Sequence, residues 1–319
     1  MIGYGSKRLL QTVPTLFIVS VVSFAILRAA PGNPAQYVAG LTATPQVLAA
    51  VSHRMGLDQP LYVQYVRWLG DALQGNFGHS YVSGRTVSSL ILAKLPATIY
   101  LAVAGMVVAA VMGTIFGLVA AARPGGRVDS AISLLTSVSL AIPTFWSGIL
   151  LILLFSVRLN WLPSGFMSSP SQGIGAFFSS LILPAVTLGL NYFPVFARFL
   201  RGGLLEARGQ PYVRTAVSKG LDPWYTFRVY VLRNGIQPML TSIGMVFGRL
   251  LGGVVITESV FSWPGLGSLM VTSIGNRDYA VVQASLLLAV LAVVLVNLVV
   301  DLAQAIVDPP SRLTARSMT

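Results

Sequence analysis

The sequence has no cysteine and few charged residues for its length of 319. Without cysteine, the chain can form no disulfide bond, no thiolate metal site and no cysteine nucleophile. Charged residues make up 9% of the chain, against about 25% in a typical soluble domain. Hydrophobic residues make up 55%. So few charges cannot cover a water-facing surface, and a soluble globular protein is excluded.

Histidines and catalytic motifs are also scarce. His53 and His79 are 26 residues apart, whereas paired histidine ligands on a helix are separated by only a few residues. We expect both to be surface residues and predict no metal site. No G-x-x-x-x-G-K-[ST] phosphate loop is present, so the chain does not bind ATP in that way. Because both histidines lie outside the apolar runs, no Ser/His/Asp set forms in the membrane. We predict no enzyme activity.

Long uncharged runs are the main feature that is present. A helix crosses the hydrocarbon core with about 20 mostly apolar residues. The runs predict an all-α, polytopic membrane protein with six transmembrane helices, at residues 9–30, 95–122, 131–157, 181–200, 235–258 and 279–307. Leu9–Leu27 is longer than the apolar region of about 7–15 residues in a secretory signal. We therefore expect it to be a retained first helix.

The basic residues indicate the orientation of these helices. Thirteen Lys and Arg fall on the side that holds the two termini, and six fall on the other side. Basic residues gather on the cytoplasmic side of membrane proteins. Both termini are therefore predicted to be cytoplasmic, and the net charge of +12 is a topology signal rather than a nucleic-acid site.

Two connections are long enough to suggest function. Residues 31–94 would be an external segment with a helix over 60–73, and residues 201–234 would be a cytoplasmic loop. The predicted organisation is a first helix plus external segment over 1–94, a five-helix core over 95–307 and a cytoplasmic tail over 308–319.

The cytoplasmic loop contains the signals of a short helix. Pro211 suits the first helical turn, and Gly220 suits the position just after the last, with Lys219 near the negative end of the helix dipole. Asp222 and Pro223 would begin the next segment. The alternative is a basic loop held near anionic lipid headgroups.

A second candidate segment consists of Trp263, Pro264, Gly265 and Gly267. Pro264 would stop the fifth helix, and the two glycines would allow sharp turns. Irregular backbone at membrane depth survives only where protein or a water cavity covers it. The segment therefore predicts a re-entrant external gate. The alternative is an ordinary helix-ending turn with Trp263 at the interface.

Several motifs occur in an order that resembles one family. The loop motif is Tyr212-Val-Arg-Thr-Ala-x-x-Lys-Gly220, followed by Val231-Leu-Arg-Asn-Gly-Ile-Gln-Pro238. Further matching segments are Pro31–Pro34, Gly56–Pro60, Gly75–Gly78, Leu95–Thr98, Gly252–Gly267, Asn297–Asp301 and Asp308-Pro309. The chain resembles permease subunits of the dipeptide, oligopeptide and nickel branch of ABC importers, and in particular the first of their two permeases.

The resemblance implies a type I ABC importer permease fold and an ATP-driven, alternating-access mechanism. It implies four kinds of partner: a second homologous permease, two cytoplasmic ATP-binding subunits that hold ATP–Mg, an extracytoplasmic solute-binding protein and the lipid bilayer. It also implies that the loop helix couples to an ATPase through Tyr212, Val213, Arg214, Thr215, Ala216, Lys219 and Gly220. The cargo stays open between a dipeptide, a longer peptide, glutathione and a nickel chelate.

The sequence departs from the general family pattern at four places. Arg214-Thr-Ala216 replaces Glu-Ala-Ala, as is usual in this branch, and Gln210-Pro211 replaces a pair that is commonly acidic. Arg249 stands where a small or hydroxyl residue is expected, and Gln304 where an aromatic is common. The first two departures leave coupling intact, and the last two concern the substrate.

Arg249 lies in the middle of the fifth predicted helix, where an arginine against lipid costs at least about 2.5–3.5 kcal/mol. Glu258 follows nine residues later, on the opposite face of the helix. We therefore expect Arg249 to face the pathway, or alternatively to be satisfied by backbone carbonyls within the bundle. In the last helix, Asn297, Asp301 and Gln304 share one face, which should be turned into the bundle in a structural role.

Two other classes of membrane protein remain as alternatives. An ion-coupled secondary carrier usually has repeated halves and ionisable residues near the midplane, and the sequence has no evident repeat. A non-transporting anchor would support no ATP-dependent uptake, and a membrane hydrolase lacks its catalytic set. We therefore predict a transport subunit rather than an enzyme.

Overall fold

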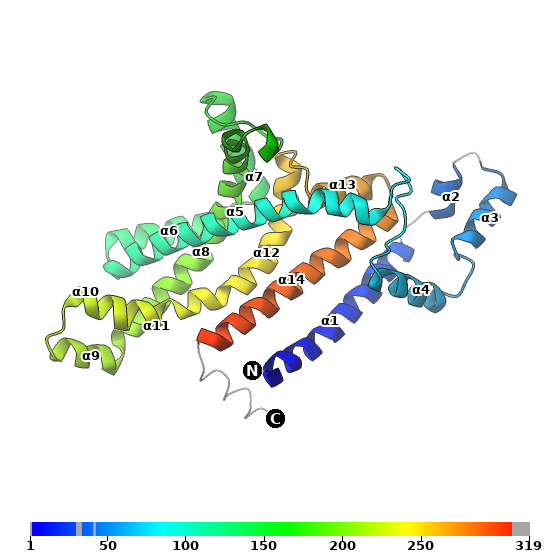
Figure 1. Ribbon diagram of the computed structural model, residues 1–319. Coiled ribbons are helices and arrows are strands. Elements are labelled where there is room, and N and C mark those ends of the chain that lie inside the picture. Colours follow the sequence, from blue (N-terminus) through cyan, green and yellow to red (C-terminus); the bar gives the residue numbers. More distant parts are fainter. Residues whose placement is uncertain (1, 30–33, 41–42, 308–319) are drawn as a thin grey trace. The chain divides into compact units, whose positions relative to one another are not determined.

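The computed structural model describes residues 2–29, 34–40 and 43–307, and every regular element in these ranges is helical (Figure 1). An isolated β-bridge pairs His79 with Thr86. The α-helices are α1 (Ile2–Ala29), α2 (Pro34–Ala39), α3 (Pro45–Arg54), α4 (Leu61–Leu73), α5 (Val87–Ala122), α6 (Arg127–Ala141), α7 (Thr144–Leu151), α8 (Ile174–Gly209), α9 (Pro211–Ser218), α10 (Pro223–Thr226), α11 (Arg233–Gly235), α12 (Gln237–Val260), α13 (Leu266–Gly275) and α14 (Tyr279–Val307). Two π-helical stretches, Ile152–Arg158 and Phe227–Leu232, continue α7 and α10.

Four helical segments of the described chain are long and apolar enough to cross a membrane. They are Val87–Ala122, Ile174–Gly209, Pro223–Val260 and Tyr279–Val300. A bent pair over residues 127–158 makes a fifth if it is one span. The first predicted span falls in α1, where the apolar helix found among the described residues is the shorter Val13–Ala25. The all-α membrane architecture is confirmed, and the count of six spans stays a prediction.

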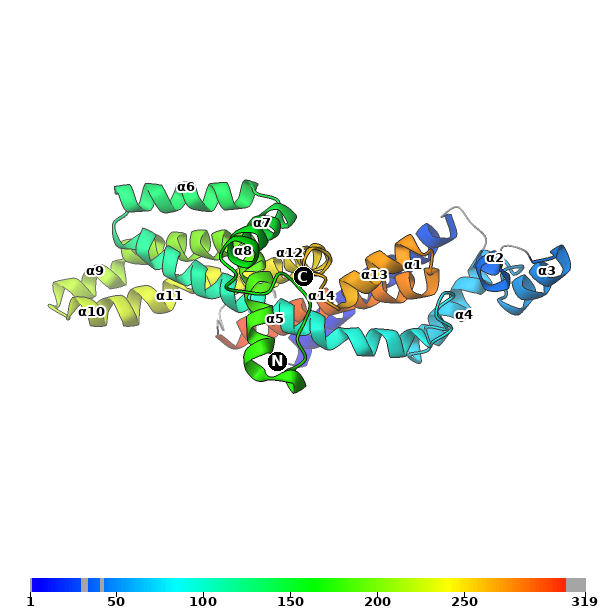
Figure 2. The ribbon, with the colours of Figure 1, turned by 90° about the horizontal axis from the view of Figure 1, so that it is seen from above.

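The third predicted helix is broken, which corrects the expectation of one continuous span over 131–157. α6 ends at Ala141, α7 begins at Thr144, and the two axes differ by 104° (Figure 2). Pro143 has no N–H for the helix ladder, and its ring disfavours helical backbone at the preceding residue. Ile142 is accordingly extended, with ψ 124°. The local chemistry of one proline therefore overrides the apolar run.

The described chain forms two compact units. Unit 1 comprises residues 1–98 and 264–295, and unit 2 comprises residues 99–263 and 296–319. Unit 1 has a core of Val87, Ile91, Val281 and Ala284. Beside it, the buried Asp278 accepts hydrogen bonds from the Ser80 hydroxyl and the Tyr81 N–H, which fasten the loop before α5 to the start of α14.

In unit 2, α8 packs closely against α5 because glycine stands at their crossings. A Cβ on Gly113 would lie 2.4 Å from the Phe196 Cβ, and one on Gly189 would lie 2.3 Å from the Val108 side chain. Small residues let membrane helices approach one another in this way. The core around these crossings contains Ala109, Ala121, Phe196, Leu200, Leu204, Ala207, Val213, Val231, Met239 and Val246.

Candidate functional site

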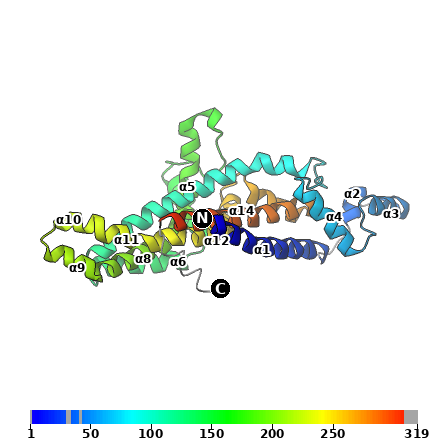
Figure 3. The same cartoon turned by 60° about the horizontal axis from the view of Figure 1, so that its bottom comes forward.

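The predicted loop helix is present as α9, and the signals read from its sequence act at its two ends. Pro211 occupies its first turn, and Lys219 follows its last residue. Gly220 has φ +72°, a left-handed conformation that glycine adopts without strain. Asp222 then caps α10 by accepting a hydrogen bond from the Tyr225 N–H at 2.8 Å. Figures 1 and 3 show α9 and α10 together beyond the end of α8.

The seven predicted coupling residues divide into an inner and an outer set. Val213 and Ala216 are buried, and Val213 belongs to the core of unit 2. The other five, Tyr212, Arg214, Thr215, Lys219 and Gly220, are exposed. α9 is therefore anchored by an apolar inner face, while its polar and aromatic outer face is exposed.

α9 and α10 form a helical hairpin after α8, and its base is fixed by contacts that sequence reasoning missed. The Arg208 guanidinium donates to the Ala121 carbonyl at 2.6 Å and lies over the Phe227 ring at 5.9 Å. Arg201 forms a two-point ion pair with Asp129, with N–O distances of 2.6 and 2.7 Å. From the sequence alone, both arginines indicate only the membrane topology. α8 runs to Gly209, so the predicted loop over 201–234 begins as helix rather than as loop.

The hairpin also depends on contact between two glycines. A Cβ on Gly203 of α8 would lie 2.2 Å from the carbonyl oxygen of Gly235 in α11, and one on Gly235 would lie 2.8 Å from the Leu204 side chain. The Val231–Pro238 motif therefore passes directly against the backbone of α8. No local sequence signal identifies this crossing, because it depends on which helix lies opposite.

The predicted gate segment has a different backbone from the one expected. α12 already ends at Val260, before Pro264, and the left-handed residue is Ser262, with φ +50°. Gly265 is extended, with φ −98° and ψ −171°, and Gly267 lies within α13. Ser262 turns the chain between Phe261 and Trp263, which are buried, at 1% and 0% exposure.

The two halves of the gate segment belong to different units. In unit 2, the Trp263 N–H donates to the Glu258 carbonyl at 2.8 Å. In unit 1, the Leu266 N–H donates to the Thr98 hydroxyl at 2.7 Å. α13 has 10 residues, which is too short to cross a membrane and fits a re-entrant segment. Whether this segment works as a gate stays a prediction.

Arg249 lies in the middle of α12, and its side chain is exposed. Its carbonyl accepts a hydrogen bond from the Tyr192 hydroxyl at 2.8 Å. Within the described chain its guanidinium has no carboxylate partner. Glu258, nine residues later, is 0% exposed. Arg249 is therefore exposed and Glu258 buried, which agrees with their predicted placement on opposite faces of the helix.

The polar face predicted on the last helix is described in part. A Cβ on Gly244 of α12 would lie 2.7 Å from the Asn297 side-chain oxygen. Asn297 therefore faces α12 rather than lipid. The side chains of Asp301 and Gln304, and the predicted tail over 308–319, lie outside the described residues.

Comparison with known proteins identifies the family. Residues 113–312 match the family described as the binding-protein-dependent transport system inner membrane component, and residues 1–102 match its N-terminal counterpart. The chain is 42% identical to "Probable peptide ABC transporter permease protein y4tP" of Sinorhizobium fredii, over 97% of this chain and 99% of that protein. It is 41% identical to the glutathione transport system permease protein GsiC of Escherichia coli (strain K12), over 98% and 99%.

A third relative is the di/tripeptide transport system permease protein DppB of Pseudomonas aeruginosa, with 38% identity over 98% of this chain and 99% of that protein. The fold resembles that of the MetNI methionine ABC transporter in an inward-facing conformation, with a TM-score of 0.55, 19% identity and coverage of 69% of this chain and 96% of that one. The match extends over most of the chain, so it supports a transport component rather than an enzyme or an ion-coupled carrier. The chain belongs to the family of binding-protein-dependent transport system inner membrane components, the multi-pass inner-membrane permease subunits of ABC importers.

Proposed function

We propose that this permease imports short peptides, a class that includes the tripeptide glutathione. The observation that carries the proposal is α9, an exposed helix anchored by Val213 and Ala216 and ended by Gly220. Such a helix suits the transmission of ATP-driven movement from a cytoplasmic subunit. The cargo class follows from the names of three relatives at 38–42% identity, which are transporters of peptides, di- and tripeptides, or glutathione.

In this proposal the chain pairs with a second, homologous permease, and two ATP-binding subunits that hold ATP–Mg bind on the α9 side. Both termini are cytoplasmic. A solute-binding protein delivers cargo to the opposite side, and the two permeases open alternately. This chain holds no cofactor of its own.

The function is tested by uptake into proteoliposomes that contain the chain, its co-expressed partners and the binding protein. We expect labelled dipeptide or glutathione to accumulate only when ATP is on the ATPase side. Accumulation driven by an ion gradient without ATP, or no uptake of any peptide, would overturn the proposal.

The segment Trp263–Gly267 is proposed to form part of the external gate. Because the chain has no cysteine, an introduced cysteine at the exposed Ser262 is the one reactive thiol of this subunit. We expect Ser262→Cys to crosslink to cysteines placed in the second permease at a rate that differs between ATP-bound and ATP-free states. A cysteine at Ser83, exposed in the external segment, is the control. Equal crosslinking in both states would identify a static turn.

Arg249 is proposed to face the pathway and to contact the carboxylate of the cargo. Its exposed position in the middle of α12 supports this, since a guanidinium pairs with a carboxylate through two hydrogen bonds. We expect Arg249→Gln to reduce dialanine uptake about tenfold, the effect of losing one charge-assisted hydrogen bond, and to change uptake of dialanine amide much less. Equal losses for both cargoes, together with poor assembly, would contradict a substrate contact.

A further inference from the structure

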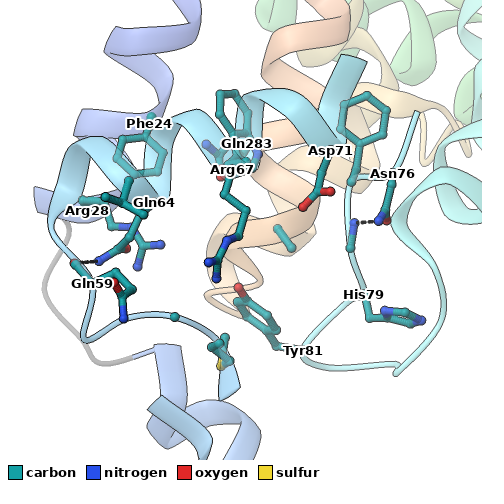
Figure 4. Close-up of a pocket in the computed structure, with 17 residues that line it drawn as sticks. Phe24, Arg28, Gln59, Gln64, Arg67, Asp71, Asn76, His79, Tyr81 and Gln283 are labelled. Carbon is teal, nitrogen blue, oxygen red and sulfur yellow. Dashed lines mark hydrogen bonds between the residues drawn. The ribbon is translucent and has the colours of Figure 1, made fainter. Parts of the chain in front are cut away.

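Unit 1 contains a cavity of about 240 Å³ between the end of α1, the α3–α4 connection, α4, the loop that follows it and the start of α14 (Figure 4). The cavity shares no residue with α9, with the gate segment or with Arg249. Its polar lining includes Arg28, Gln64, Arg67, Asp71, Tyr81 and Gln283.

One part of the lining contains hydrogen-bond donors that have no acceptor among the described residues. In the described chain neither Arg28 nor Arg67 has a carboxylate within salt-bridge distance, and the Arg28 guanidinium lies 5.3 Å above the Phe24 ring. The Gln283 amide nitrogen is buried and has no partner among the described residues. Buried polar groups are nearly always paired. Two guanidinium groups and a buried amide N–H therefore favour an anion that accepts several hydrogen bonds.

The Tyr81 hydroxyl adds a neutral donor to this set. Burial raises the pKa of the Tyr81 phenol, the nearby Arg28 opposes this shift, and Asp278 adds to it. The phenol therefore keeps its proton at neutral pH. Figure 4 shows Tyr81, Arg67 and Asp71 directed toward the same space.

The other part of the lining contains hydrogen-bond acceptors that have no donor among the described residues. The Gln64 amide nitrogen donates to the carbonyls of Leu57 at 3.1 Å and Gln59 at 2.7 Å, which fixes the orientation of the amide. Its oxygen is buried and has no partner among the described residues. Asp71, one helical turn after Arg67, contributes a carboxylate to the same cavity. Gln64 and Asp71 are seven residues apart on α4, about 10 Å along its axis. The Asp71 carboxylate therefore suits a cationic donor such as an ammonium group, while the Gln64 oxygen needs a separate N–H or O–H donor.

We propose that this cavity binds a small zwitterion, an amino acid or a dipeptide. Its carboxylate would be held by Arg28, Arg67, Gln283 and Tyr81, and its ammonium group by Asp71. Pockets for drug-sized ligands measure about 300–1,000 Å³, so a cavity of about 240 Å³ suits one or two residues rather than a long peptide. The inference rests on the proposed function only for the choice of peptide as ligand.

The test is equilibrium binding of labelled dialanine to the full chain, purified with its co-expressed partner subunits and without ATP or binding protein. We expect dialanine to bind, and both N-acetyl-dialanine and dialanine amide to bind at least about tenfold more weakly, since each lacks one charged end. Arg67→Gln and Asp71→Asn should each weaken dialanine binding to a similar extent. Arg54→Gln, an exposed change in the same external segment but outside the cavity, should leave it unchanged.

Binding is measured independently of uptake, so its failure is separable from failure of the transport function. Equal dialanine affinity in the original protein and in Arg67→Gln would overturn the site. So would acetate binding as tightly as dialanine, which would indicate a simple anion site. A third outcome would also overturn the proposal: the original protein binds no dialanine, and Arg67→Gln no longer docks the binding protein. The cavity would then receive an acidic side chain of that partner.

Discussion

Replacing Gly203 with alanine is expected to remove most of the folded, transport-competent permease. The added Cβ would lie 2.2 Å from the carbonyl oxygen of Gly235, so α8 and α11 would have to separate at the base of the α9 hairpin. Overpacking a core typically costs about 1–3 kcal/mol, and we expect the upper end because the opposing atom is backbone and cannot change rotamer. The measurements are the melting temperature of the purified chain and ATP-dependent uptake.

The adjacent glycine supplies a matched control. Gly202 is exposed, and a Cβ there would meet no atom within 4 Å. Both substitutions add one methyl group to the same helix, and both favour helix formation by about 1 kcal/mol because alanine replaces glycine. Gly202→Ala should therefore fold and transport normally. Equal behaviour of the two variants would show that the Gly203–Gly235 contact is unimportant.

Replacing Gly220 with tryptophan should abolish uptake while the permease still reaches the membrane. Left-handed backbone costs a residue other than glycine about 1–2 kcal/mol, and a Cβ at Gly220 meets no atom of this chain within 4 Å. The permease itself should therefore tolerate the change. A bulky side chain directly after α9 would, however, block the proposed docking of this helix on an ATPase subunit.

Gly220→Asn is the control, because asparagine adopts left-handed backbone more readily than most residues and is small. We expect it to retain most of the uptake. The two variants are compared by membrane yield, by co-purification of the ATPases and by ATP-dependent uptake. Uptake at the original rate by Gly220→Trp would contradict a coupling role for α9.

Features set by neighbouring residues could be predicted from the sequence. The apolar runs predicted an all-α membrane protein, and four of the predicted spans are long apolar helices in the described chain, because crossing a bilayer depends on the length and composition of a segment. Pro211, Lys219 and Gly220 predicted α9 because helix ends are governed by residues within one turn. The order of several motifs identified the family, which the comparisons confirmed.

The tertiary structure decided where helices meet and which side chains they bring together. Arg201 and Asp129 are 72 residues apart, and their ion pair exists only because α6 and α8 pack against each other. The chain turns at Ser262, between the buried Phe261 and Trp263, rather than at Gly265. The cavity lined by Arg28, Arg67 and Gln283 combines residues of α1, α4 and α14. Contacts between distant segments depend on helix crossings, and these follow from the packing of whole surfaces rather than from a local pattern.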